Sequence, residues 1–513
     1  MIADFDVIVI GAGHNGLVCA AYLAKAGLSV CVLERSHRVG GACITEELYP
    51  GCQFSTFAYN ANGPGPKICR DLEIPADAIK VTPANPSMFN PFPNGEHIFL
   101  WSDADKTAAE LRRFNAQDAD AFYRYGDFMS KAKQIAKDMF YRSPPSVRQL
   151  EERYLGTEFE PVLQAMLNRS LWSVIEEHFS DEHIKCVFAR ADDVGSPTNV
   201  GSLLAEVVES ANDGVGVDGI AGIPSGGMGA VSAALAKAAE RFGVEIHRES
   251  AVRSVVVENG VAVGVRLSDD RVLTGKHIVS NADPKRTFLN LVPADALDVE
   301  FRAKVAALKT RAGNMKFHAV LSGVPEFTAM PSEFRGDAKA IAGVRIAPTL
   351  QYIDAAWQDC LKGIPSREPV MSLQLPTAYW PELAPEGKHI FGAWIRYGPG
   401  ELAQGTWDEW RPRVAESVIS AIESYAPGFR DLIEWHRLYT PADIQRETGI
   451  THGTIRHLDM TIDQMLHRRP LPPWSSYATP LNGLWLCGSG THPCGSVTGA
   501  PGHNAAHAIL ESL

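Results

Sequence analysis

The hydrophobic pattern is clearest in residues 1–42, where two different periods follow one another. Residues 6–10 form a short apolar run, which predicts a strand buried on both faces. Residues 17–26 carry apolar side chains at helical spacing, and residues 29–33 form a second β-like run. This succession predicts a strand, a helix and a second strand in close order, as at the start of a parallel βαβ unit.

A glycine-rich turn joins the first predicted strand to the helix. It reads Gly11-Ala12-Gly13-His14-Asn15-Gly16, a G-x-G-x-x-G pattern, and the acidic Glu34 ends the second strand. In this pattern the first glycine makes a tight turn, the second lets the backbone approach a pyrophosphate, and the third lets helix and strand pack closely. Glu34 can accept both ribose hydroxyls, which argues against a 2′-phosphate. The unit therefore predicts a dinucleotide site.

The period of the pattern changes repeatedly along the rest of the chain. Further strands are predicted as short pieces within residues 76–100 and at residues 251–258, 261–267, 277–280, 317–321, 370–375, 389–397 and 484–487. Helices are predicted within residues 103–210 and at residues 230–242, 300–308, 407–425 and 505–510. Gly222 to Gly229 opens one of these helices, but no buried strand precedes it and no acidic residue follows at the right distance. We therefore expect no separate NAD site there.

Two other glycine-rich segments lie where a longer cofactor needs them. Gly40-Gly41-Ala42 follows the ribose acid, and FAD extends beyond the first motif, so more backbone must approach its phosphates and flavin. Gly488-Ser489-Gly490 follows the strand at residues 484–487, and Val497-Thr498-Gly499 precedes the last helix. A strand, a glycine loop and a helix N-terminus form a second site suited to an anion. The pattern favours FAD over NAD.

These motifs resemble those of the flavoprotein superfamily of amine oxidases and carotenoid desaturases. At residues 11–17, 280–284, 449–453 and 488–504 they are similar to the phytoene-dehydrogenase-related flavoproteins, and within these to the branch of pyridine nucleotide-disulfide oxidoreductase domain-containing protein 2. The resemblance covers essentially the full chain and implies non-covalent FAD, although Cys494 departs from the glycine of the pattern. The predicted cofactor-binding residues are Gly11, Gly13, His14, Asn15, Gly16, Glu34, Arg35, Gly40, Gly41, Ala42, Val252, Ala282, Gly488, Ser489, Val497 and Thr498.

The resemblance also implies an α/β fold built from two interleaved parts. The first is a discontinuous, Rossmann-like FAD-binding domain of the glutathione-reductase and amine-oxidase type, formed by residues 1–75, 222–290 and 470–513. The second is an α+β substrate domain, formed by residues 76–221 and 291–469. Candidate substrate-contacting residues, each of which equally suits a core position, are Tyr59, Asn60, Gln374, Trp394 and Tyr397.

The reaction implied by the resemblance is dehydrogenation of a C–C or C–N bond in an apolar, isoprenoid or cyclic, small molecule, by hydride transfer to flavin N5. His503 is the candidate catalytic residue, and its alternative role is a hydrogen bond to backbone in the glycine loop. Two other interpretations stay open: a redox-neutral isomerase or hydratase that uses reduced FAD, and a flavin-loaded protein whose main role is to bind a partner.

Composition narrows the partners and the compartment. The 513 residues carry a net charge of −12 and no Lys/Arg block, which argues against nucleic acid. We see no apolar run long enough to span a membrane, and peripheral membrane contact is expected only if the substrate is a lipid. The nine cysteines lack metal-like spacing, so we expect no metal site, reduced thiols and a cytoplasmic location. Cys43 and Cys52 are interpreted as ordinary buried thiols. The oligomeric state is left open, with a homodimer as one option.

Overall fold

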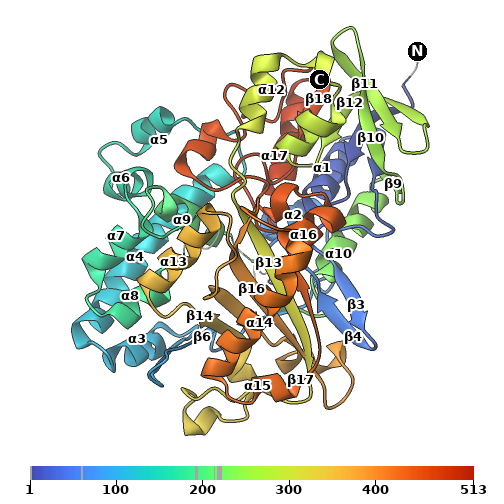
Figure 1. The fold of residues 1–513 in the computed structure, drawn as a ribbon. Coiled ribbons are helices and arrows are strands. Elements are labelled where there is room, and N and C mark those ends of the chain that lie inside the picture. The colour runs from blue at the N-terminus through green and yellow to red at the C-terminus, as the bar shows by residue number, and fades with distance from the viewer. Residues whose placement is uncertain (1–2, 59, 61, 191–194, 213, 216–221) are drawn as a thin grey trace.

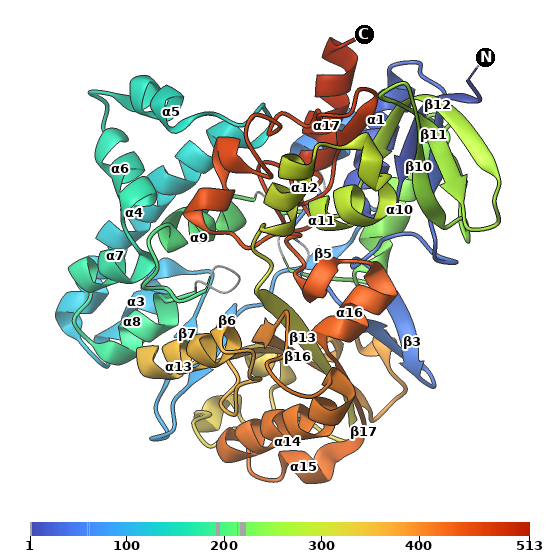
Figure 2. The same cartoon turned by 45° about the horizontal axis from the view of Figure 1, so that its top comes forward.

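The computed structural model of the protein describes residues 3–58, 60, 62–190, 195–212, 214–215 and 222–513. Three regions meet at its centre: a largely parallel sheet with its helices, a lobe of helices, and a second sheet flanked by helices (Figures 1 and 2). Segments far apart in the sequence build each region, so the chain crosses between them several times. The protein is an α/β protein in which a Rossmann-like part is interleaved with an α+β part.

The first sheet contains the predicted βαβ unit. In spatial order its strands are β10 (Val252–Glu258), β11 (Val261–Leu267), β12 (Val272–Ser280), β1 (Phe5–Ile10), β2 (Val30–Leu33) and β9 (Glu245–His247), with β18 (Leu484–Leu486) also paired to β12. Strands β18, β12, β1, β2 and β9 run parallel, whereas β10, β11 and β12 form an antiparallel meander. The carboxyl ends of the parallel strands consequently meet at one edge of the sheet.

Apolar side chains cover both faces of this sheet, as expected for buried parallel strands. Alternate residues of β1, such as Val7 and Ile8, belong to separate cores on the two faces. The helices are α1 (His14–Lys25), α10 (Gly229–Arg241) and α17 (Ala500–Glu511) on one face, and α12 (Val299–Ala306) on the other. Figure 1 shows α1 and α17 close together, so the first and last helices of the chain share one core.

The second sheet forms the lower part of the molecule in Figure 2. In spatial order its strands are β17 (Ile433–Tyr439), β13 (Ala312–Leu321), β16 (His389–Pro399), β15 (Met371–Gln374), β14 (Gly343–Ile346), β6 (Met88–Pro91) and β7 (His97–Leu100). Helices α14 (Trp407–Tyr425) and α15 (Phe429–Leu432) cover one face. That face is apolar, with Met315, Phe317 and Leu373 in one core.

The helical lobe fills the left side of both views (Figures 1 and 2). Its helices are α3 (Ala104–Arg112), α4 (Ala116–Phe140), α5 (Val147–Tyr154), α6 (Glu160–Asn168), α7 (Leu171–His178), α8 (Glu182–Phe188), α9 (Ser202–Ser210) and α13 (Leu350–Leu361). The smaller elements are β3 (Thr45–Tyr49), β4 (Cys52–Ser55), α2 (Pro66–Asp71), β5 (Val81–Thr82), β8 (Ile223–Pro224), α11 (Pro284–Arg286) and α16 (Pro441–Thr448).

The predicted elements agree with the structure in kind and differ at their ends. Helix α1 begins at His14, three residues before the predicted start, because the extended Gly13 is its N-cap. Helix α17 likewise begins at Ala500, inside the glycine segment. The sequence analysis did not predict β14, β17, α13 or α16. Strand β14 and helix α16 are short and bury the charged residues Arg345 and Asp443.

All nine cysteines are free and buried. The Cys43 thiol donates to the carbonyl of Met228 at 3.2 Å, whereas Cys52 packs beside Phe54 and Val320 in a separate cluster. Among the described residues, no helix combines the length and the apolarity that crossing a membrane requires.

Candidate cofactor and active site

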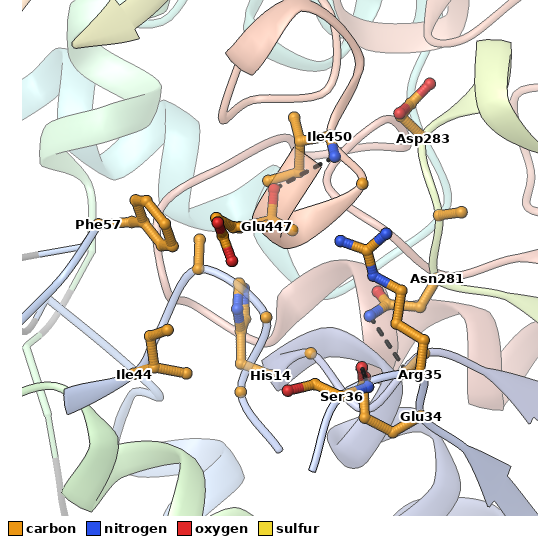
Figure 3. A pocket seen from close by; sticks show the side chains of 18 of the residues that line it. His14, Glu34, Arg35, Ser36, Ile44, Phe57, Asn281, Asp283, Glu447 and Ile450 are labelled. Atoms are coloured by element: carbon orange, nitrogen blue, oxygen red, sulfur yellow. Dashed lines mark hydrogen bonds between the residues drawn. The ribbon is translucent and has the colours of Figure 1, made fainter. Parts of the chain in front are cut away.

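A cavity of about 360 Å³ lies where the parallel strands of the first sheet end. The predicted cofactor-binding residues that line it are Gly11, Gly13, His14, Asn15, Glu34, Arg35, Gly40, Gly41, Ala42, Val252, Ala282 and Ser489. Figure 3 shows Glu34, Arg35 and Ser36 on one side of the cavity, and Phe57 and Ile44 on the other. The cavity therefore extends from the end of β2 toward residues that pack near the second sheet.

Glu34 is fixed by backbone hydrogen bonds at one end of the cavity. The N–H of Ala12 donates to Oε2 at 2.8 Å and the N–H of Ser36 donates to Oε1 at 2.9 Å. The N–H of Glu34 itself donates to the carbonyl of His247 at 2.8 Å, which attaches this residue to β9. Each carboxylate oxygen keeps a further acceptor site, so two adjacent hydroxyl groups could bind here.

The glycine turn is packed so closely that side chains are excluded. Gly11 has φ +97°, in the left-handed region that favours glycine. A Cβ at Gly13 would lie 2.7 Å from Nδ2 of Asn281, and one at Gly16 would meet the carbonyl oxygen of Gly11. The Asn281 amide in turn donates to that same carbonyl at 3.3 Å. The end of β12 therefore covers the turn and keeps its backbone in place.

Three buried polar atoms of cavity-lining residues have no hydrogen-bond partner within the described residues: Nε2 of His14, Oδ1 of Asn15 and Nδ1 of His457. Burial lowers the pKa of both His14 and His457 to about 4, so each ring is neutral at pH 7. Buried polar groups are normally paired, and three unpaired ones around a single cavity indicate a polar ligand. FAD fits this requirement, since its diphosphate and ribityl hydroxyls supply both donors and acceptors.

The C-terminal glycine turn presents unpaired N–H groups. The buried residues Gly488, Ser489 and Gly490 donate no backbone hydrogen bond within the described residues. Their carbonyls are engaged instead: Gly488 accepts from Thr491, and Ser489 accepts from Arg469 at 2.9 Å. A turn with engaged carbonyls and free N–H groups is suited to bind an anion.

Two of the family-like motifs meet at Asp283. Its buried carboxylate accepts from the N–H and the hydroxyl of Thr451, each at 2.9 Å, and from the N–H of Arg286 at 2.8 Å. Asp283, Arg286 and the neighbouring Gly449 all line the cavity. This hydrogen-bond cluster joins the end of β12 to the segment after α16 and closes one wall of the cavity.

The other wall belongs to the second sheet. Tyr439 of β17 lines the cavity, and Lys316 of β13 is its register partner. Trp394 of β16 and Ser372 of β15 continue the same row across the sheet. Cross-strand partners point to the same face, and the Lys316 ammonium lies 5.4 Å from the centre of the Trp394 ring. Lys316 is therefore a fully buried amine one strand away from the cavity wall.

His318 lies in the next row of this face. It pairs with Arg437 of β17, which also lines the cavity, and its Nε2 contacts the carbonyl oxygen of Thr56 at 2.9 Å. Burial lowers the pKa of His318 to about 3. In contrast to the face under α14, this face of the second sheet is polar and aromatic.

The predicted substrate-contacting residues are dispersed. Trp394 and Gln374 lie on this polar face, Gln374 in the row of His318 through Gly392. Tyr397 is turned to the helical lobe, where its hydroxyl donates to the carbonyl of Gly195 at 2.9 Å. Asn60 is exposed and donates to Asn62, while Tyr59 lies outside the described residues. Of those described, none lines the cavity.

His503 is not among the described residues that line the cavity. It is buried in α17 between Tyr22 and Tyr141, with ring centroids 5.0 and 5.1 Å away, and its Nδ1 contacts Oδ1 of Asn504 at 2.8 Å. Burial lowers its pKa to about 4. The structure thus places this residue in a core of α1 and α17.

Four predicted cofactor-binding residues do not line the cavity. Gly16 packs against the turn, and Gly488 lies between Asn281 and His457, where a Cβ would be 2.7 Å from the Asn281 carbonyl. Val497 and Thr498 pack against the backbone of Gly63. Gly16 and Gly488 therefore pack behind residues of the cavity lining, Gly11 and Asn281.

Sequence reasoning did not name Asn281, Asp283, His457 or Lys316 as site residues. Asn281 and Asp283 belong to a motif at the end of a predicted strand, where parallel sheets carry their sites, so position alone could have identified them. Lys316 directly precedes the strand predicted at residues 317–321, so extending that strand by one residue would have placed a charge within it. His457 had no such signal, because only the folded chain brings it to Gly488.

The chain matches the NAD(P)-binding Rossmann-like domain over residues 9–72. Pyridine nucleotide-disulfide oxidoreductase domain-containing protein 2 from Mus musculus is 33% identical to it, with 99% of this chain and 94% of that protein covered. The chain belongs to this branch of the phytoene-dehydrogenase-related flavoproteins.

Two further proteins that are similar to this chain are oxidoreductases by name. One of the subunits of limonene dehydrogenase from Castellaniella defragrans is 25% identical over 99% of this chain and 95% of that protein. A solved structure of a putrescine oxidase triple mutant is 14% identical, covers 99% of both chains and has a TM-score of 0.61, which shows a shared amine-oxidase fold. The prediction of a phytoene-dehydrogenase-related oxidoreductase with this fold is confirmed.

Proposed function

We propose that the cavity binds FAD non-covalently. Glu34 would hold the ribose hydroxyls, and the N–H groups at Gly13 and at the Gly488–Gly490 turn would hold the diphosphate. The observation that carries this proposal is the set of unpaired buried atoms on His14, Asn15 and His457, which surround one cavity. FAD, rather than a shorter ligand, is favoured because the lining runs from Val252 to Phe57.

We infer that the protein is an FAD-dependent oxidoreductase that dehydrogenates a C–C or C–N bond of an apolar, isoprenoid or cyclic, small molecule. When bound, FAD supplies a hydride acceptor. The chain supplies an aromatic and polar face, with Phe57, Tyr439 and Trp394 to orient the substrate. On this face Lys316, whose pKa burial lowers well below its ordinary value, can accept a proton.

We also propose the two-domain division that the sequence suggests. Residues 1–75, 222–290 and 470–513 would form the FAD-binding domain, and residues 76–221 and 291–469 the substrate domain. The assignment of the FAD-binding domain is supported by the first sheet, because all its strands (β1, β2, β9 to β12 and β18) come from these three segments. The nine free, buried thiols support a cytoplasmic location.

The test is an anaerobic absorbance titration of the purified protein with FAD bound. Polyenes, cyclic amines and NADPH are added in turn, and loss of the flavin band is recorded. We expect an organic substrate to bleach the band and NADPH alone to leave it unchanged. Bleaching by NADPH alone would contradict the expectation that the chain has no nicotinamide site.

A matched variant separates binding from chemistry. Glu34→Ala removes the ribose acceptor, and we expect it to weaken FAD binding by about tenfold, the effect of roughly 1.4 kcal/mol of lost hydrogen bonding. A wild-type protein that binds no FAD would overturn the proposal. If FAD binds, nothing bleaches it, and chemically reduced protein converts a substrate without net oxidation, the protein is a redox-neutral isomerase or hydratase.

A further inference from the structure

Arg469 is a fully buried arginine behind the C-terminal glycine turn. Among the described residues its guanidinium donates only to backbone carbonyls. Nε and Nη2 reach Ser489 at 3.2 and 2.9 Å, and Nη1 reaches Gln464 at 3.1 Å. The carbonyls of Arg456, Leu458 and Asp459 complete the set. One side chain thereby ties the 456–464 segment to the turn that contacts the cavity.

Within the described residues this charge has no counter-ion: Arg469 makes no ion pair, although a buried arginine usually pairs with a carboxylate. The carboxylate of Asp459, a residue whose backbone carbonyl accepts from Arg469, is turned toward Arg311, which donates to it at 3.0 Å from both Nε and its backbone N–H. The cluster of these three residues therefore keeps a net positive charge, with Arg469 and Asp459 buried and Arg311 partly exposed.

The hydrogen bonds of Arg469 also orient the peptide between Ser489 and Gly490. In a trans peptide the N–H points opposite to the carbonyl, so holding the Ser489 carbonyl directs the Gly490 N–H away from Arg469. Ser489 lines the cavity, and its hydroxyl accepts from Nδ2 of Asn15 at 3.2 Å. The two glycine turns of the chain are thus in direct contact at this point.

We propose that Arg469 is a positioning residue for the cofactor diphosphate, acting through the Ser489–Gly490 peptide. Its charge polarises the peptide and adds a positive potential that a low-dielectric interior screens only weakly. The N–H groups of Gly488 to Gly490 then bind the diphosphate more strongly than an isolated turn. Arg469 does not contact the cofactor cavity itself. This inference rests on the proposed binding of FAD.

The test compares two substitutions that break the same hydrogen bonds. Arg469→Lys keeps the charge and Arg469→Gln removes it, and each loses most of the guanidinium contacts. FAD dissociation constants are measured by flavin fluorescence, and melting temperatures are measured on the FAD-free proteins. We expect similar losses of melting temperature in both variants. We expect FAD binding to weaken by about tenfold more in Arg469→Gln than in Arg469→Lys.

An equal loss of FAD affinity in both variants would overturn the proposal, because Arg469 would then act only through its hydrogen bonds to backbone carbonyls. If Arg469→Gln does not fold, Arg469→Lys decides: lowered stability with wild-type FAD affinity supports the proposal, and affinity that falls with stability contradicts it. Arg468→Gln is the control, since the half-buried Arg468 donates to one carbonyl, that of Ile462. A wild-type protein that binds no FAD would instead overturn the proposed function, and this inference with it.

Discussion

Several ionisable side chains are buried in the otherwise apolar interior of this protein. Lys316, His318 and Arg469 are all buried, and each lies next to residues of the cavity or its turns. Burying a charged group or an imidazole destabilises the fold unless hydrogen bonds or ion pairs compensate for the lost hydration. Buried ionisable groups beside a cavity are candidate functional positions, and the substrate-contacting role of Tyr397, which bonds to the helical lobe, stays a prediction.

Lys316→Met tests the role of the buried amine. Burial and the charge of Arg396 lower the Lys316 pKa well below its ordinary value, so the amine can be neutral and accept a proton. We expect turnover to fall by about 10²- to 10⁴-fold, the range for loss of a proton-transfer group, with FAD affinity unchanged. Stopped-flow flavin reduction measures this. The exposed Lys339→Met is the control, and unchanged reduction in Lys316→Met would contradict the role.

The site is formed by elements whose ends meet at one edge of the first sheet, although some of them are far apart in the sequence. Strands β1, β2, β12 and β18 end at one edge, and α1 and α17 begin there. The sequence predicted most of these elements because glycine turns and buried runs are local signals. It did not predict α16 and β17, whose charged residues pair only after folding, as Arg411 does with Asp443.

Gly13→Ala tests the contact between the first turn and β12. The new methyl group would lie 2.7 Å from the Asn281 amide, so we expect loss of FAD binding and a lower melting temperature. The double variant Gly13→Ala/Asn281→Ala should recover part of both if this clash is the cause. Gly126→Ala is the matched control, since a Cβ there meets nothing within 4 Å, and alanine should stabilise α4 by about 1 kcal/mol. No recovery in the double variant would show that the clash is not the cause.

At the scale of the whole molecule, the three regions enclose a set of neutral histidines. His14 and His457 line the cavity, and His492 joins the C-terminal turn to the helical lobe through the carbonyl of Met139 at 2.9 Å. Burial lowers the pKa of each to about 4. Because all three must be protonated on acid unfolding, the assembled fold depends on pH.

The expected pH dependence follows from the direction of these shifts. The unfolded chain takes up protons near pH 6.5, whereas the folded protein does so only near pH 4. The stabilisation is therefore complete above about pH 6.5 and is lost as pH falls toward 4, by roughly 3 kcal/mol for each histidine. Urea unfolding at a series of pH values measures this loss as a change in the free energy of unfolding. His492→Gln should weaken the pH dependence of that free energy, and the control His37→Gln, at an exposed position, should not. The same pH dependence in wild type and His492→Gln would contradict the prediction.

The sequence by itself determined the βαβ unit, the glycine turns and the acid at Glu34, because strand, turn and helix there are encoded by neighbouring residues. It also placed the second glycine turn after the last strand. Only the tertiary structure decided which buried residues surround the cavity. His457 meets Gly488, and Arg469 holds the next residue, Ser489, from outside the cavity lining, whereas His503 packs away from both. Contacts between distant segments leave no local pattern, so the chain had to fold before its site could be seen.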